Sequence, residues 1–312
     1  MPTVETVLGP VEASKLGAIL SHEHVLISMG NDARNYPWRY DWDRTRKNAV
    51  HEISEAKAGG IGTLIDLTTP DLGRNVRYVR DIAAATGMHI VVATGIWRDV
   101  PRSFWERDPA ETASIFIHEI QEGIEDSGIK AGAIKVANDA EGVTPEAENV
   151  LRGAARACKE TGTPISTHQW APKEVGRRQV EIFREEGAPM DRVCIGHSAD
   201  STDPDYLEEL LNAGVYLSMD RYPGVPPRPE WDARNRTLKE LIDRGWAHRL
   251  MVGHDYAPMP ILKDQPDPEP KPTRYLFLHT TALPALREQG VSEDTIHTIT
   301  HETPAHFLTA HR

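Results

Sequence analysis

Eight short apolar segments recur along this chain, and helix-like sequence separates most of them. Their positions are 19–25, 62–68, 89–97, 132–137, 164–168, 193–197, 215–220 and 249–255. The clearest helix between them has Thr144 as its N-cap, Pro145 at its first position and Gly162 as its stop. Such alternation is typical of parallel βαβ units, and eight strands are the number that closes a barrel. We therefore predict an α/β fold, a (β/α)8 TIM barrel forming one domain over residues 1–312, with an open doubly wound sheet as the alternative.

Composition narrows the classes of partner. The net charge of −12 disfavours phosphate backbones and anionic membranes, so we expect neither nucleic acid nor membrane as a partner, and a small molecule as the substrate. The first residues lack the basic and apolar regions of a secretory signal, and no apolar run reaches about 18 residues. We expect a cytoplasmic protein in which both cysteines, Cys158 and Cys194, are buried, reduced thiols.

The first apolar segment ends in the triplet His22-Glu23-His24. Successive side chains of a strand alternate between its faces, so the two imidazoles project to one side and the carboxylate to the other. With 14 histidines in 312 residues, such a spacing arises by chance roughly 0.6 times, so the triplet alone is weak. Its place at the end of a predicted strand is what makes it half of a candidate metal site.

Polar residues recur at the ends of later segments. A lone histidine at such a place is ordinarily a hydrogen-bonded structural residue, but the carboxyl ends of all strands meet on one rim of a closed barrel. A set of nitrogen and oxygen ligands without thiolate favours zinc, with manganese or cobalt as alternatives. The candidate ligands are His22, His24, Lys135, His168, His197 and Asp255.

Lys135 is the most informative of these residues, because Ile134 and Val136 flank it. A buried ammonium is costly, so the amine should be neutral or modified; an ion-paired lysine is the alternative. A neutral amine can add carbon dioxide, and the resulting carbamate is a carboxylate able to bridge two cations. Two cations sharing a hydroxide would supply a nucleophile near neutral pH, which is hydrolytic chemistry.

As a set, these motifs resemble those of the phosphotriesterase family of the amidohydrolase superfamily, a group that includes the phosphotriesterase-like lactonases. The similarity runs nearly end to end, through Gly9-Pro10, Ser-His-Glu-His-Val at 21–25, Gly-Ile-Lys-Ala-Gly-Ala-Ile-Lys-Val-Ala at 128–137, Ile-Ser-Thr-His at 165–168, Ile-Gly-His-Ser at 195–198 and Asp255. The resemblance implies a barrel with a binuclear metal centre and a homodimer. It places His22, His24 and Asp255 on the more buried metal, His168 and His197 on the more exposed one, and carboxylated Lys135 between them.

The same resemblance implies roles for three catalytic residues. Asp255 would take the proton from the attacking hydroxide and pass it outward. Asp200, three residues after His197, matches a carboxylate behind the metal ligands. Arg221 stands at the next relay position, and because a guanidinium hardly deprotonates, we expect it to hold the carboxylates by ion pairing.

Signals for the substrate are mixed. Asp220-Arg221-Tyr222 resembles the lactonases, and the following loop, 223–231, is too short for a long helical lid. Trp97, by contrast, stands where lactonases usually carry a tyrosine and phosphotriesterases a tryptophan. Trp97, Trp170, Arg221 and the proline-rich segment 256–275 are candidates for contacts to the substrate, with simple packing as the alternative for the tryptophans and a stiff connector as the alternative for the segment.

The sequence therefore predicts a metal-dependent hydrolase acting on lactones, with acyl-homoserine lactones as candidate substrates and organophosphate triesters as a second activity. The first alternative reverses that order, and the second is a cyclic amide hydrolase of the same superfamily. Deaminases of the superfamily usually lack the bridging lysine, so Lys135 disfavours them. A binding protein on a degenerate barrel is disfavoured because all six ligand positions are filled.

Overall fold

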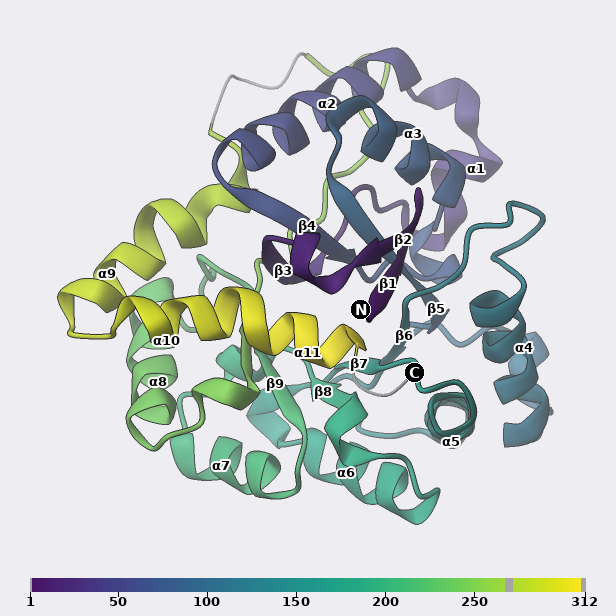
Figure 1. Cartoon of the computed structure of the whole chain (residues 1–312). Helices are drawn as coiled ribbons and strands as arrows, with labels where there is room; N and C mark the ends of the chain where they lie inside the picture. Colours follow the sequence, from purple (N-terminus) through teal and green to yellow (C-terminus); the bar gives the residue numbers. More distant parts are fainter. Residues whose placement is uncertain (1, 267–271, 310–312) are drawn as a thin grey trace.

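The computed structural model of the chain describes residues 2–266 and 272–309, and its centre is a ring of eight parallel strands (Figure 1). Each strand pairs with the next one along the chain, as repeated right-handed βα units require. The predicted (β/α)8 barrel is confirmed, and the open sheet is excluded. The strands are β3 (Ala18–Glu23), β4 (Ile61–Asp66), β5 (His89–Ile96), β6 (Ala133–Ala137), β7 (Ile165–His168), β8 (Val193–Ile195), β9 (Tyr216–Met219) and β10 (Leu250–Val252).

The ring closes between β10 and β3 through hydrogen bonds outside the regular ladder. The Asp255 amide donates to the His22 carbonyl at 2.9 Å, and the His24 amide donates to the Tyr256 carbonyl at 3.1 Å. The Ser21 hydroxyl adds a 2.9 Å bond to the Val252 carbonyl. The seam of the barrel is thus made by the same short segments that carry the first and last predicted ligands.

Helices surround the strands, and their ends follow the signals in the sequence. Thr144 accepts a hydrogen bond from the Ala147 amide, and Gly162 has a φ of +73°, so both predicted ends of α5 are confirmed. The helix after β5 ends at Gln121, two residues before Gly123, whose φ of +136° no helix accommodates. The helices are α1 (Asp32–Asn35), α2 (Trp42–Ala58), α3 (Val76–Thr86), α4 (Pro109–Gln121), α5 (Pro145–Thr161), α6 (Gly176–Glu185), α7 (Pro204–Asn212), α8 (Trp231–Asp243), α9 (Leu283–Glu288), α10 (Glu293–His297) and α11 (Thr303–Thr309).

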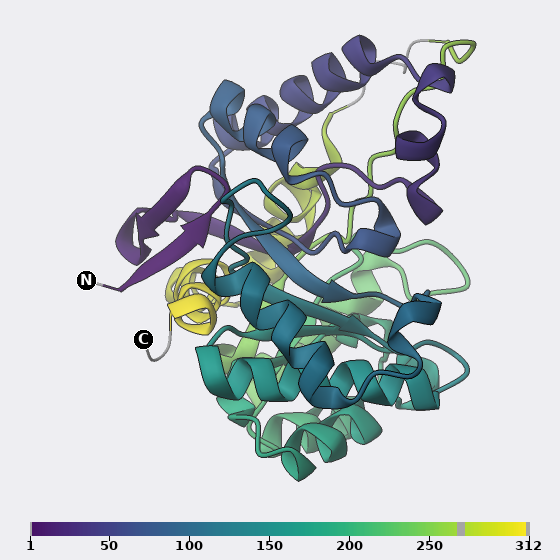
Figure 2. The same ribbon diagram turned by 90° about the vertical axis from the view of Figure 1, so that its right-hand side faces the viewer.

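The two ends of the chain cover the amino-terminal mouth of the barrel. Before β3, the chain forms a hairpin of β1 (Thr3–Thr6) and β2 (Gly9–Glu12), which lies beside α11 (Figures 1 and 2). Val4, Ile19 and Leu308 belong to one buried apolar cluster there. The hairpin is short and only partly buried, so it carries little of the alternating pattern that identifies a strand in sequence.

At the opposite rim, the loop after β3 and the segment after β10 run side by side. The Ile27 amide donates to the Pro258 carbonyl, and the Asp41 amide donates to the Ile261 carbonyl, each at 2.8 Å. The start of the proline-rich segment is therefore held against the barrel, whereas its residues 267–271 lie outside the described residues. No helix in the described part of the chain is long and apolar enough to cross a bilayer.

Candidate active site

The six predicted ligands meet at the carboxyl-terminal rim. Nε2 of His24 and Nε2 of His22 lie 3.1 and 3.4 Å from Oδ1 of Asp255. Nζ of Lys135 is 3.2 Å from the same His22 nitrogen. Nδ1 of His168 faces Nε2 of His197 at 2.9 Å. Residues from five strands or strand ends therefore bring their side chains into one buried cluster.

Two glycines let the strands approach closely enough for this. A Cβ on Gly95 would lie 1.9 Å from the carbonyl oxygen of Lys135, and the Gly95 φ is +112°. A Cβ on Gly253 would lie 2.9 Å from the amide nitrogen of His22. A side chain at Gly95 would push β5 away from the strand of Lys135, and one at Gly253 would push the end of β10 away from the strand of His22.

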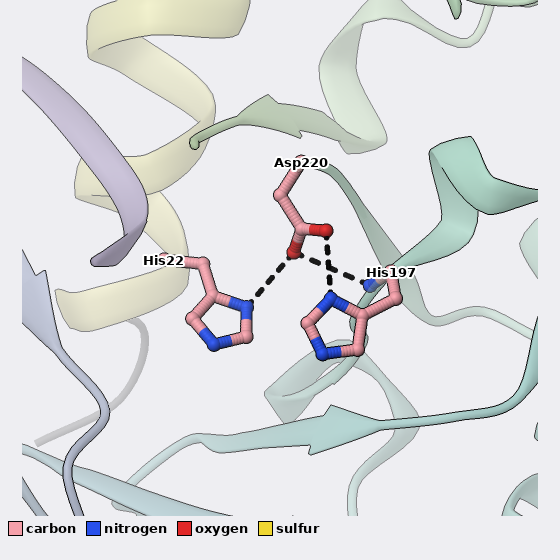
Figure 3. A group of neighbouring side chains, drawn as sticks. All are labelled: His22, His197 and Asp220. Atoms are coloured by element: carbon pink, nitrogen blue, oxygen red, sulfur yellow. Dashed lines mark hydrogen bonds and ion pairs between the residues drawn. The ribbon is translucent and has the colours of Figure 1, made fainter. Parts of the chain in front are cut away.

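Asp220 orients two of the histidines, and sequence reasoning gave this residue no role. Its carboxylate lies 2.9 Å from Nδ1 of His22 and 2.9 Å from Nδ1 of His197, and it also accepts from the His197 amide at 3.2 Å (Figure 3). A carboxylate between hydrogen-bonding rings acts as an acceptor, so both Nδ1 atoms carry the proton. Both Nε2 atoms are then lone pairs that point away from Asp220.

His24 is held in the same tautomer by a different partner. Its Nδ1 lies 2.9 Å from the Thr68 hydroxyl oxygen, and that hydroxyl in turn donates to the Asp66 carboxylate. Since the hydroxyl proton is already committed to Asp66, Nδ1 of His24 is the donor in the first bond. Nε2 of His24 is left as a lone pair facing Asp255.

This arrangement fits bound cations. The lone pair on Nε2 of His24 faces a carboxylate oxygen at 3.1 Å, a contact that repels unless a positive charge lies between the two atoms. Burial lowers the pKa of His22 and His197, and it lowers that of His168 to about 4, so the rings are neutral at pH 7 and available as ligands. The donor atoms of His22, His24 and Asp255 all lie within 4.8 Å of one another. A second group, His22, His197 and Asp220, meets that spacing through the hydrogen-bonded Nδ1 atoms, so we interpret it as support for the rings.

Lys135 is only 1% exposed, and burial lowers its pKa to about 8. Besides His22, its Nζ contacts the Thr167 carbonyl oxygen at 3.3 Å. A substantial neutral fraction of this amine is therefore present slightly above neutral pH, the form that the predicted carboxylation requires.

Arg221 links the two carboxylates that the sequence assigned to it. Its Nε donates to Asp255 at 3.0 Å, and its Nη1 donates to Asp200 at 2.6 Å. Arg234, which sequence reasoning missed, is fully buried and donates to the other oxygen of Asp200 at 2.7 Å. Burial opposes ionisation of Asp255, yet its neighbours, His22 and Arg221 among them, hold its pKa well below the usual range.

Three of these residues have strained backbones. His197, Arg221 and Asp255 have φ values of +55°, +65° and +49°. Left-handed backbone is uncommon for residues other than glycine and costs of order 1 kcal/mol or more, so surrounding contacts must enforce it. For Asp255 the enforcing residue is Glu23, whose buried carboxylate accepts from the amides on both sides, those of His254 and Tyr256, at 2.7 and 3.1 Å.

His254 therefore points away from the centre. Its Nδ1 lies 2.8 Å from the Glu23 carboxylate, and its Nε2 accepts from the Leu278 amide at 3.1 Å. Glu23 and His254 together fix the segment that presents Asp255. The position of Glu23 between two ligand histidines is a signal that sequence reasoning could have used; Asp220, at the end of a predicted strand, carried the same kind of signal.

A pocket of about 230 Å³ opens onto the cluster. The indole nitrogen of Trp97 approaches Nδ1 of His168 at 3.4 Å, so this side chain reaches both the pocket and a predicted ligand. Trp170 does not belong to the pocket lining, and the structure places it at the start of a short 3-10 helix after β7. Apolar side chains form much of the wall: Ile27, Met29, Leu72, Trp97, Ala257 and Met259.

Comparisons with known proteins agree on one family. The model of the phosphotriesterase family matches residues 2–308. A phosphotriesterase homology protein of Mycobacterium tuberculosis is 40% identical over 316 residues, covering 97% of each chain, and an aryldialkylphosphatase of Saccharolobus solfataricus is 35% identical, covering 96% of each. A solved structure of the phosphotriesterase from Mycobacterium tuberculosis aligns with a TM-score of 0.91 at 39% identity, over 98% of both chains. With the barrel and the cluster at its rim, these matches show that the chain is a metal-dependent ester hydrolase that belongs to the phosphotriesterase family.

Proposed function

We propose that the protein hydrolyses lactones at a binuclear metal centre, with organophosphate triesters as a second class of substrate. The observation that carries the proposal is the convergence of histidine lone pairs on Asp255 and Lys135 at the floor of a largely apolar pocket. Such a pocket suits an ester with an apolar substituent, because its polar groups are concentrated where the reacting bond would lie.

In this proposal His22, His24 and Asp255 would hold the more buried cation, His168 and His197 would hold the more exposed one, and carboxylated Lys135 would be shared between them. Zinc is the proposed metal, with cobalt and manganese as alternatives. The bound cations would supply a nucleophile near neutral pH and polarise the bond under attack. Asp220 fixes the tautomers of His22 and His197, which leaves their Nε2 atoms free for the metals.

Asp255 is the proposed acceptor of the proton that attack releases. Its Oδ1 faces the histidines, and its Oδ2 accepts from Arg221. The carboxylate thus lies between the histidine cluster and the pocket-lining Arg221. Arg221 holds Asp255 and Asp200 in place and keeps Asp255 ionised between turnovers. A guanidinium is a donor only, so Arg221 itself carries no proton in this scheme.

Two observations support lactones as the first class. Asp220-Arg221-Tyr222 follows β9, and the described loop between β9 and α8 contains no helix that could form a long lid. Met29 and Met259 are about half exposed at the pocket wall, where flexible thioether side chains can accommodate an acyl chain.

Trp97 favours the second candidate, with phosphotriesters first. Its indole lies against His168 at the wall of the pocket, where it would contact an aromatic leaving group. The name of the aryldialkylphosphatase relative agrees with that order. A cyclic amide hydrolase remains the third candidate, because the metal chemistry is common to all three.

The experiment is a comparison of kcat/KM for an acyl-homoserine lactone and an aryl dialkyl phosphotriester, using one batch of protein reconstituted with zinc and bicarbonate. An excess of about two decades for the lactone, roughly 2.7 kcal/mol in transition-state stabilisation, supports the proposal. The reverse order overturns it in favour of the second candidate. Trp97→Tyr is the matched variant, and it should raise the ratio of lactone to triester hydrolysis if Trp97 sets the preference.

A further inference from the structure

Asp139 lies beside the ring of His168, although neither the sequence pattern nor the comparisons assign it a role. The end of β6 pairs with the end of β7, with Ala137 opposite His168, and the Asn138 amide donates to the His168 carbonyl at 3.0 Å. The register therefore fixes Asp139 next to that ring. One of its carboxylate oxygens, Oδ2, is 3.5 Å from Nε2 of His168.

The other nitrogen of the ring shows where the proton lies. An indole N–H can only donate, and that of Trp97 points at Nδ1 of His168 at 3.4 Å. Nδ1 is then a lone pair, which a bound cation would take over from the indole, and the proton of the neutral ring is on Nε2. That nitrogen is buried and makes no short hydrogen bond to the described residues, so the carboxylate of Asp139 is the acceptor that faces it.

His168 is thus oriented in the opposite sense to the other three histidines. His22, His24 and His197 have Nδ1 tied to an oxygen and turn Nε2 toward the cluster. His168 turns Nδ1 toward His197 and Nε2 toward Asp139. Asp220 cannot accept a hydrogen bond from a ring with this orientation. The Nε2 proton of His168 therefore needs a separate acceptor on the far side of the cluster.

Arg98 holds that acceptor in place. Its Nη1 donates to Oδ2 of Asp139 at 2.6 Å, and the Ala140 amide donates to Oδ1 at 2.8 Å. The Arg98 guanidinium also lies 5.3 Å from the centroid of the Trp97 ring. Arg98, Asp139, His168 and Trp97 form a closed cluster that joins the loops after β5 and β6 at the edge of the pocket.

We propose that Asp139, held by Arg98, is a positioning residue that selects Nδ1 of His168 as its metal-binding atom and so sets the affinity of the more exposed metal position. The inference rests on the binuclear centre proposed above, but not on the identity of the substrate. Partners of this kind fix the tautomer and orientation of a ligand histidine, and their loss typically lowers metal affinity 10- to 100-fold.

The first test measures metal binding to Asp139→Asn at controlled free zinc or cobalt concentrations, counting metal ions per chain by elemental analysis. We expect one metal to bind as in the parent protein and the second to bind about 10- to 100-fold more weakly. Glu141→Gln is the matched control, because it removes an exposed carboxylate from the same loop, and it should bind both metals like the parent. Parent-like binding of both metals by Asp139→Asn overturns the inference.

The second test reads the tautomer directly and does not depend on catalysis. Imidazole nitrogen NMR shifts in metal-free parent protein, assigned with His168→Gln, should show the His168 proton on Nε2. A proton on Nδ1 overturns the inference even if Asp139→Asn does not fold.

Arg98→Gln, at a partly exposed site, should weaken binding of the second metal by a smaller factor than Asp139→Asn. A parent protein that binds two metals but hydrolyses neither lactone nor triester refutes the proposed function and leaves this inference standing.

Discussion

The two ends of the barrel are built from the same strands but from opposite kinds of residue. At the amino-terminal mouth, Ile19 of β3 is part of an apolar cluster that the hairpin and α11 cover. Three residues further along β3, His22 is equally buried but lies among carboxylates and other histidines. Burying polar groups costs free energy unless they are paired, whereas burying aliphatic groups is favourable. The apolar packing at the amino-terminal mouth, which we call the base, therefore offsets the free-energy cost of burying the polar cluster at the carboxyl-terminal rim.

The largest expected effect belongs to the rim. Lys135→Ala should lose the metals and lower kcat/KM by at least about ten-thousandfold, roughly 5.4 kcal/mol of transition-state stabilisation. A short carboxylic acid supplied with metal should restore part of the activity by replacing the bridging carbamate. The melting temperature of metal-free protein should not fall, because the variant removes a costly buried amine. A fully active Lys135→Ala would refute the bridging role.

The next effect belongs to the base. Phe307 of α11 is 1% exposed and packs edge-on against Tyr216, with 5.3 Å between ring centroids. Phe307→Ala should lower the free energy of unfolding by about 3–5 kcal/mol, measured by denaturant titration, with kcat/KM unchanged well below the melting temperature. Phe307→Leu is the milder control. If kcat/KM instead fell in step with stability, the two ends would not be separable.

Asp255→Asn tests the chemistry of the rim while keeping the size of the side chain nearly unchanged. The fold should largely persist, since Arg221 and the Glu23 carboxylate still hold the neighbouring segment. The value of kcat should fall by about a hundredfold, roughly 2.7 kcal/mol, because an amide cannot take up the proton. Single-turnover kinetics at matched metal content provide the measurement, and an unchanged kcat would remove Asp255 from proton transfer.

The smallest effect concerns His279, which lies in the π-helical turn Leu278–Ala282 directly before α9. Burial lowers its pKa to about 4, and its Nδ1 is buried without a hydrogen bond to the described residues. As the pH falls, His279 is therefore protonated in the unfolded chain before it is protonated in the folded protein. The free energy of unfolding is unaffected by this ring above pH about 6.5, and it decreases progressively from there toward pH 4. His279→Leu should make the free energy of unfolding less dependent on pH within that window.

The measurement is a set of denaturant titrations of metal-free protein between pH 4 and 7. His51→Gln is the control, because His51 is 64% exposed on α2. It should leave the pH dependence unchanged. Equal slopes for His279→Leu and the parent would show that this ring is not held neutral by the fold.

Much of the fold followed from local signals. The N-cap of α5, its first-turn proline and its terminal glycine have the same meaning in a peptide as in the barrel, so its ends were predictable. The hairpin β1–β2 was not, because its four-residue strands gain their stability from packing under the barrel with Val4 and Leu308. Trp170 lies outside the pocket lining for a related reason: His168 reaches the cluster, but the chain enters a short 3-10 helix directly after Trp170.

By itself, the sequence determined the eight-strand barrel and which residues stand at strand ends, because hydrophobic periodicity and end signals are local properties. Only the tertiary structure decided how those residues act on one another. The ring tautomers depend on Asp220, Thr68 and Asp139, and the backbone of Asp255 depends on Glu23, more than 200 residues away in the chain. Such contacts, which range from 2.7 to 3.5 Å here, form only between atoms that the closing of the barrel brings together.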